Sequence, residues 1–160
     1  MRIFSAEYLD ELSGQAEKSA RRRQHRNVHL DYSEPCQRLF NAIEPGSYIR
    51  PHRHTSDPRD ELLIAVRGQM ALVTFNESGD VVGVLRFGSE RYGARLAIGA
   101  EVPAHIWHTV VALEPGSVLL EIKAGPFDPD RPKDLAIWAP EEGTASAGQF
   151  LRQLISRIGS

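Results

Sequence analysis

The sequence predicts an all-β protein, an antiparallel barrel or sandwich with one helix at each end of the chain. Between Val28 and Lys123, short β-branched and apolar runs are separated by turn residues roughly every eight to twelve positions, a spacing typical of antiparallel sheets. No helix of useful length fits within that span. A chain of 160 residues is long enough for one domain with a hydrophobic core and short for two domains that each have one.

Each end of the chain carries a helical pattern. Ser5 can cap a helix whose apolar residues fall at helical spacing, and a second apolar stripe follows Ser146. The members of the two stripes are Tyr8, Leu9, Leu12 and Ala16, and Phe150, Leu151, Leu154, Ile155 and Ile158. We therefore expect a helical extension over residues 1–27, a barrel over 28–125, and a loop and helix over 126–160 that pack on the barrel or on a partner subunit.

Turn residues divide the central span into hairpins. The segment 76–80 (Asn-Glu-Ser-Gly-Asp) separates the strand-like runs 70–75 and 81–87 and predicts a hairpin. Glu-Pro-Gly occurs at 44–46 and again at 114–116, and proline followed by glycine suits the centre of a type II turn. The repeated turn is weak evidence for two related halves.

Charge and hydropathy exclude several classes of protein. The formal net charge of -2 argues against a nucleic-acid binder, because the basic run from Arg21 to Arg26 is short and lacks interleaved aromatic residues. We interpret this run as a solvated helix end, with the alternative that one or two of its arginines fold over the mouth of a pocket. The longest aliphatic run, 62–66, cannot span a bilayer, and residues 1–10 lack the apolar stretch of a signal peptide, so we expect a cytoplasmic protein without a membrane partner.

Three histidines carry the strongest functional signal. His52 and His54 are one residue apart, and His108 follows on another apolar, strand-like stretch. Because successive side chains of a strand point to opposite faces, His52 and His54 share a face and can both reach one ion. A lone histidine on an apolar face is usually a hydrogen-bonded core residue, but three of them with a carboxylate favour a metal site.

The same residues indicate which ions such a site would take. Imidazoles with a carboxylate suit zinc, iron, manganese, nickel or cobalt. A purely structural zinc site is disfavoured, since such sites are typically closed and rich in cysteine. Four protein ligands on an octahedral ion leave two positions open for water or a chelating substrate.

The spacing also resembles a known family. Gly46-x5-His52-x-His54-x6-Glu61-x6-Gly68, followed by Pro103-x4-His108, resembles the two motifs of the cupin superfamily over about residues 33–123. This resemblance implies a single jelly-roll barrel, or double-stranded β-helix, in which His52, His54, Glu61 and His108 bind a divalent metal. Four segments resemble more narrowly the WbuC-type cupin metalloproteins, which implies a context of cell-surface polysaccharide metabolism: 47–54, 102–109, 121–126 and 138–142.

Two positions depart from the cupin pattern. The gap between His54 and Glu61 is longer than usual, which leaves Asp57 or Asp60 as substitute ligands, although Glu61 keeps the expected distance before Gly68. In the second motif His105 replaces the usual glycine. His105 is then an additional ligand, a base beside the site, or a residue of the rim.

Strand parity predicts further pocket residues. Tyr48 and Arg50 share a face with the paired histidines, while Glu121 and Lys123 share a face of the last strand. If these faces point inward, the pocket is polar and partly cationic and suits an anionic or hydroxyl-rich substrate. Otherwise a mutual salt bridge or outward exposure explains the charges.

The leading hypothesis is a metal-dependent isomerase or epimerase acting on a small polar or anionic, sugar-like molecule. Glu121, Tyr48 or His105 would be the acid or base, and Arg50, Lys123 and Trp107 would hold the substrate. An iron-dependent dioxygenase and a non-catalytic sugar-binding or sensing module remain alternatives. A serine hydrolase is set aside because no GxSxG elbow occurs. The cupin resemblance and the apolar terminal helix favour a homodimer.

Overall fold

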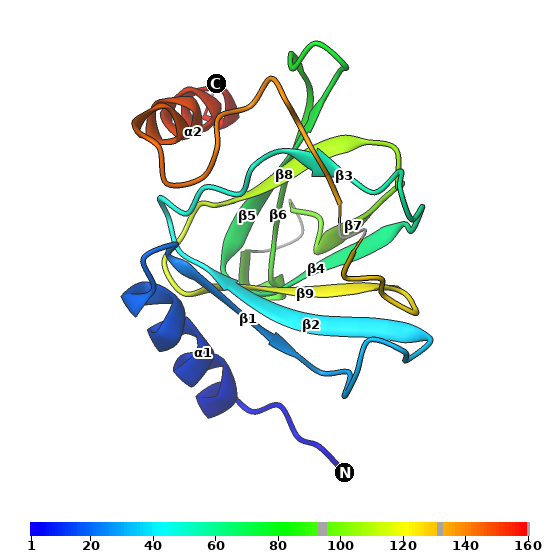
Figure 1. Cartoon of the computed structure of the whole chain (residues 1–160). Helices are drawn as coiled ribbons and strands as arrows, with labels where there is room; N and C mark the ends of the chain where they lie inside the picture. Colours follow the sequence, from blue (N-terminus) through cyan, green and yellow to red (C-terminus); the bar gives the residue numbers. More distant parts are fainter. Residues whose placement is uncertain (93–95, 131–132, 160) are drawn as a thin grey trace.

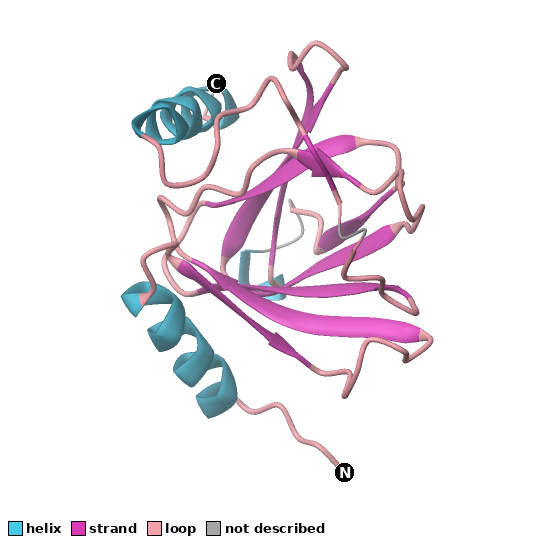
Figure 2. Cartoon of the chain, in the orientation of Figure 1, coloured by secondary structure: helices cyan, strands magenta, loops and turns pink. Residues whose placement is uncertain are grey.

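Two antiparallel sheets face each other, and one helix lies outside each sheet (Figures 1 and 2). The computed structural model describes residues 1–92, 96–130 and 133–159. Sheet A has the order β1 (Arg23–Asn27), β2 (Cys36–Ile43), β9 (Ser117–Ala124), β4 (Glu61–Arg67) and β7 (Gly99–Val102). Sheet B has the order β10 (Asp134–Leu135), β3 (His52–Arg53), β8 (Trp107–Ala112), β5 (Gln69–Phe75) and β6 (Val81–Gly88). A short 3₁₀ turn, η1 (Glu90–Tyr92), follows β6.

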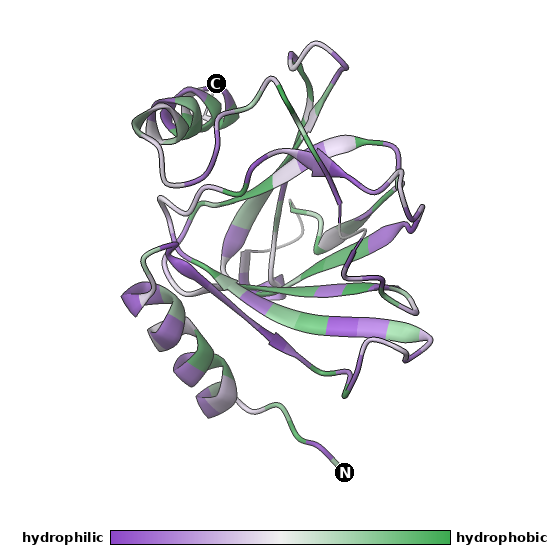
Figure 3. Cartoon of the chain, viewed as in Figure 1, coloured by the Kyte–Doolittle hydropathy of each residue, from purple (hydrophilic) through white to green (hydrophobic). Residues whose placement is uncertain are grey.

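The predicted N-terminal helix is α1 (Ala6–Lys18), which covers sheet A (Figure 1). The Ser5 side chain caps it by accepting a hydrogen bond from the Tyr8 backbone N–H at 3.4 Å. Leu12 and Ala16 are fully buried on its inner face, whereas polar residues occupy the outer one (Figure 3). This face packs against the outer side of β2 and β9, on Phe40, Ala42 and Val118.

The C-terminal helix is α2 (Ala145–Ile158), and it covers sheet B. Its buried residues pack on the outer side of β5 and β8: Ala147, Leu151, Leu154 and Ile158. Ile155, which the predicted stripe included, is instead 41% exposed. The stripe therefore serves packing on the barrel and gives no independent support for a dimer. Among the described residues, neither this helix nor α1 has the length and apolar character needed to cross a bilayer.

Strand β8 is buried along its whole length because both of its faces are covered. Val110 points between the sheets, where it joins Leu63 and Leu119 in the barrel interior. Val111, on the alternate face, packs outward beneath α2. Because the helices cover the outer faces of the sheets, both faces of the central strands can be apolar. The apolar packing outside the barrel adds to that inside it, so the interior can also contain a few polar groups.

The predicted turns are confirmed. The segment 76–80 joins β5 to β6, and Gly46 and Gly116 have positive φ angles of 90° and 69° at the two Glu-Pro-Gly turns. These two turns touch, because the Gly116 backbone N–H donates to the Glu44 carboxylate at 2.9 Å.

The barrel extends beyond the boundaries predicted from sequence. Strand β1 lies within the segment assigned to a helical extension, and β10 lies within the segment assigned to a surface loop and helix. The basic run was wrongly placed at the helix end: α1 stops at Lys18, and Arg23 already belongs to β1. Residues 131–132 of the predicted loop lie outside the described residues.

We predict that Gly68→Ala destabilises the fold by about 3 kcal/mol or more, measured by urea denaturation. Gly68 has φ 74°, and a Cβ there would lie 2.2 Å from the Ser117 Oγ. Gly116→Ala is the matched control, since its φ is 69° but no atom lies within 4 Å of the added Cβ, so only about 1 kcal/mol of backbone strain is expected. Equal losses in the two variants would contradict the predicted clash.

Candidate metal centre

Strand register brings the predicted ligands together from both sheets. His52 on β3 lies directly opposite His108 on β8, and Glu61 on β4 lies directly opposite Lys123 on β9. Directly opposite residues of an antiparallel pair project on the same face, here the barrel interior. His54 follows β3, and its backbone N–H donates to the Ala104 carbonyl at 2.8 Å, which fixes its position.

The four side chains form one buried cluster. The ligand atoms of His52, His54, Glu61 and His108 all lie within 4.8 Å of one another. The two oxygens of Glu61 face different histidines, at 3.1 Å from the His54 Nε2 and 3.3 Å from the His108 Nε2. None of the four residues is more than 9% exposed. Two atoms that each lie about 2.0–2.2 Å from one ion are at most about 4.4 Å apart, so a small inward shift of these side chains would bring all four onto an ion.

Hydrogen bonds on the far side of the rings orient two of the histidines. The Nδ1 of His52 lies 3.0 Å from the Arg50 carbonyl, and the Nδ1 of His108 lies 2.9 Å from the Ile106 carbonyl. A carbonyl can only accept, so each Nδ1 carries a proton, and in the neutral ring, the form that binds a metal, each Nε2 then has a lone pair for an ion. His54 Nε2 is buried and has no hydrogen bond of acceptable geometry among the described residues, despite its proximity to Glu61.

The electrostatics favour a neutral imidazole and an ionised carboxylate. Burial, together with the positive charge of Lys133, holds the pKa of His52 well below its usual range. Burial would raise the pKa of Glu61, but contacts with His108 and His54 and the charge of Lys123 outweigh it and lower the pKa well below its usual range. These are the protonation states that metal ligands require.

Glu121 and Lys123 stand next to the cluster, as strand parity predicts. The Lys123 Nζ lies 3.1 Å from a Glu61 oxygen and 3.5 Å from a Glu121 oxygen. Burial and the neighbouring charge of Glu61 raise the pKa of Glu121 to about 7. Burial would lower the pKa of Lys123, but the two carboxylates raise it overall. Lys123 is therefore a charged bridge between a candidate ligand and a second buried carboxyl group.

The cluster lines a cavity of about 300 Å³. Four cationic side chains line it against two carboxylates: Arg21, Arg23, Lys123 and Lys133 against Glu61 and Glu121. The cavity is thus polar and partly cationic. Sequence reasoning did not single out Lys133, although the loop that ends there was expected to edge the pocket, and it offered the arginines only as an alternative. The alternation of Arg23 and His25 on one face of β1 was the available signal, because both line the cavity; Arg21 precedes the strand and lines the cavity too.

Tyr48 and Arg50 do not line this cavity. The Tyr48 hydroxyl donates to the Pro140 carbonyl at 2.9 Å, and its ring packs near α2. The Arg50 guanidinium donates to the Ala136 carbonyl, with Nη2 at 2.8 Å. The parity argument fails here because residues 47–51 are not in a strand: β3 begins only after Pro51, so alternation does not carry back past it.

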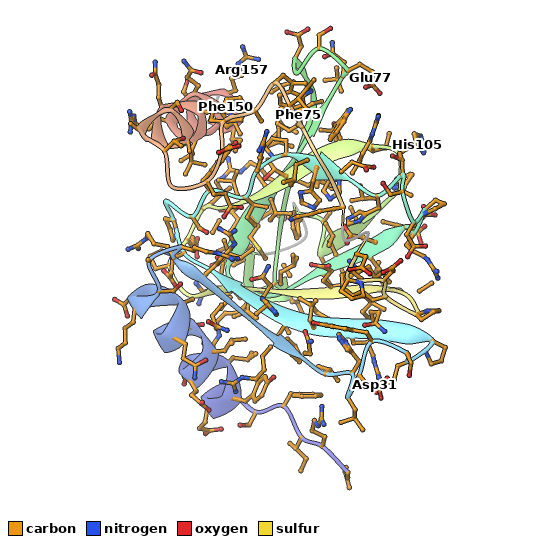
Figure 4. All side chains as sticks on the ribbon, in the orientation of Figure 1. Asp31, Phe75, Glu77, His105, Phe150 and Arg157 are labelled. Atoms are coloured by element: carbon orange, nitrogen blue, oxygen red, sulfur yellow. The ribbon has the colours of Figure 1, made fainter. Side chains whose placement is uncertain are left out.

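His105 and Trp107 also lie outside the cavity. His105 is exposed on the turn between β7 and β8, at the periphery of the molecule (Figure 4). Trp107 shares a strand with His108 but points to the opposite face. Its indole N–H donates to Glu77 at 3.1 Å, and the Arg53 guanidinium stacks 4.2 Å from its ring centroid. Its neighbours are thus structural ones on the outer side of sheet B.

The alternative carboxylates are engaged elsewhere. Asp57 pairs with Arg59 at 3.0 Å, and Asp60 accepts the Ala104 backbone N–H at 2.9 Å. Asp60 therefore holds the turn that also receives the His54 N–H, and only Glu61 joins the three histidines in the cluster. The long segment between His54 and Glu61 is absorbed by a turn before β4.

The comparisons with known proteins agree with this architecture. A family model described as "Domain of unknown function (DUF6016)" matches residues 4–87, more than half of the chain. The chain belongs to this family. The matched region of the DUF6016 domain includes His52, His54 and Glu61 and ends before His108. A search of the curated proteins finds no match.

Solved structures show the fold of this DUF6016 protein. KdgF from Halomonas sp. is 20% identical, with a TM-score of 0.51 over 68% of this chain and 83% of that one. A variant of Bacillus subtilis oxalate decarboxylase is 21% identical, with a TM-score of 0.52 over 69% of this chain and 28% of that one. SO0799 from Shewanella oneidensis is 11% identical, with a TM-score of 0.54 over 69% and 72%. The barrel is a cupin barrel, and the chain spans little more than a quarter of the decarboxylase's length.

We predict that Lys123→Met destabilises the metal-free protein by about 2–4 kcal/mol, measured by urea denaturation in the presence of a chelator. The reason is that Glu61, only 3% exposed, would lose its cationic partner while remaining in the barrel interior. In a Glu61→Gln background the same substitution is expected to cost much less. An equal cost in both backgrounds would contradict the ion pair.

Proposed function

We propose that the protein is a divalent-metal-dependent cupin enzyme of the WbuC type that acts on a small, polar or anionic, sugar-like molecule by isomerisation or epimerisation. The observation that carries this proposal is the buried cluster of His52, His54, Glu61 and His108 at the wall of a cavity that also holds Glu121 and Lys123. Support comes from the fold, because the oxalate decarboxylase of similar fold has Mn(II) centres.

The donor set fits a divalent ion of borderline character. Each of the three imidazoles offers a nitrogen, and Glu61 offers a carboxylate oxygen. The Lys123 ammonium contacts the same carboxylate. Such a set suits manganese, iron, cobalt, nickel or zinc. When bound, the ion supplies Lewis-acid polarisation of a carbonyl or hydroxyl oxygen.

The residues around the cluster supply the remaining chemistry. Glu121 has a side chain that is 18% exposed, lines the cavity, and contacts Lys123 at 3.5 Å. Its carboxyl group is placed to take a proton from a substrate carbon or hydroxyl and to return it, which is what an isomerase requires. Lys123 stabilises the charge that changes on Glu121 as the proton moves. Tyr48 and His105 lie outside the cavity, so Glu121 is the acid or base that we propose.

We predict that the purified protein contains close to one equivalent of divalent metal and that His52→Ala and His108→Ala each lose most of it. Elemental analysis of protein purified without added metal measures the content. His105→Ala is the matched control, because this exposed histidine lies on the turn just before β8 and is expected to leave the metal in place. Wild-type protein that neither contains metal nor takes it up on titration would contradict the metal-dependent function.

We predict that Glu121→Gln retains the metal but slows exchange of a substrate carbon-bound proton with deuterated water by at least about 100-fold. The assay incubates metal-loaded protein with candidate sugars in D₂O and follows exchange by NMR. Oxygen uptake in the iron form would instead assign a dioxygenase. A ligand that binds tightly and is recovered without exchange would assign a binding or sensing module.

A further inference from the structure

The cavity has a cationic end that the cluster of metal-binding residues does not use. Strand β1 is one edge of sheet A, and its residues Arg23 and His25 line the cavity; β10 is one edge of sheet B, and Lys133, just before it, lines the cavity too. Arg21 lines the cavity from just before β1. Arg21, His25 and Lys133 are exposed whereas the residues of the metal cluster are buried, so these three residues mark the mouth of the cavity.

Three carboxylates lie near this end, and each of them contacts Arg23 or Lys123. Glu142 is held by Arg23, whose Nη2 lies 2.5 Å from it, and lies 3.9 Å from the exposed Arg21. Arg23 also donates to the Tyr48 carbonyl at 2.9 Å, so it is committed to holding the chain. Glu61 and Glu121 are in contact with Lys123. The four cations that line the cavity (Arg21, Arg23, Lys123 and Lys133) thus outnumber the three carboxylates, so net positive charge is available to a ligand.

The positive electrostatic potential at the mouth of the cavity affects the pKa of His25. Burial and the charges of Arg21 and Arg23 lower the pKa of His25. An anion placed among these groups would relieve their mutual repulsion and replace part of the lost hydration.

We propose that the mouth of the cavity is an oxyanion subsite, formed by Arg21, His25 and Lys133, that binds a carboxylate or phosphate group separate from the substrate atoms held at the metal cluster. This inference deepens the proposed function, because it uses the same cavity. Guanidinium and ammonium groups are the usual partners of both oxyanions. A cavity of about 300 Å³ is at the small end of ligand sites, which suits a ligand the size of one sugar acid or sugar phosphate.

Calorimetry on the metal-loaded full-length protein tests the subsite with three probes: D-glucuronate, D-glucose 6-phosphate and uncharged D-glucose. At least one charged probe is expected to bind ten times more tightly than glucose, and the stronger of the two identifies the oxyanion. Lys133→Met and Arg21→Gln should each weaken that probe at least fivefold, whereas Lys133→Arg should retain it. Lys18→Met, on the exposed end of α1, is the matched control.

Metal content measured on the same samples separates this inference from the proposed function. Charged probes that bind no more tightly than glucose, or not at all, would overturn the subsite, as would equal affinities in Lys133→Met and Lys18→Met. If the protein lacks metal but a charged probe still depends on Lys133, the subsite stands and the metal-dependent function fails. If metal is present and Lys133→Met changes no affinity, only the subsite fails.

Discussion

Glu61 is a carboxylate buried between two sheets, and its ionised form is tolerated there only because partners from both sheets surround it. Lys123 approaches from the neighbouring strand of sheet A, while His54 and His108 approach from sheet B. Removing a carboxylate from water costs several kcal/mol unless such partners replace its hydration. These partners reach Glu61 because the two sheets face each other. The register of β4 on β9 places Lys123 opposite Glu61, and the pairing of β3 with β8 places the histidines on the facing sheet.

The polar interior has to be supported by apolar burial elsewhere. Helices α1 and α2 cover the outer faces of the two sheets, so both sides of the central strands contribute apolar contacts. That arrangement leaves one end of the barrel interior free for ionisable groups while Leu63, Val110 and Leu119 fill the space between the sheets. Burial of this kind contributes roughly 25 cal/mol for each Å² of apolar surface. The apolar burial under the two helices thus helps to offset the free-energy cost of keeping ionisable groups in the cavity.

Local alternation predicts the site well where a strand is continuous. His108 and Val110 point inward and Trp107 and Val111 point outward along β8, as a period of two requires. The same rule fails for Arg50, because Pro51 interrupts the chain just before β3 and the preceding segment is not a strand. The hairpin and the capping of α1 by Ser5 were predictable because they depend on adjacent residues.

The sequence alone does not predict how the edge strands β1 and β10 pair with the rest of the two sheets. Strand β1 is five residues of mostly polar character, and its place in sheet A depends on β2, which supplies its hydrogen-bonding partner. Lys133 lines the cavity and comes directly before β10, which pairs with β3. These two edges convert an internal cluster of ligands into a cavity with two chemically different ends. One end offers nitrogen and oxygen donors to an ion, and the other offers positive charge to an anion. A ligand that spans them would have its orientation fixed by charge before any proton moves, which places Glu121 against one chosen part of the substrate.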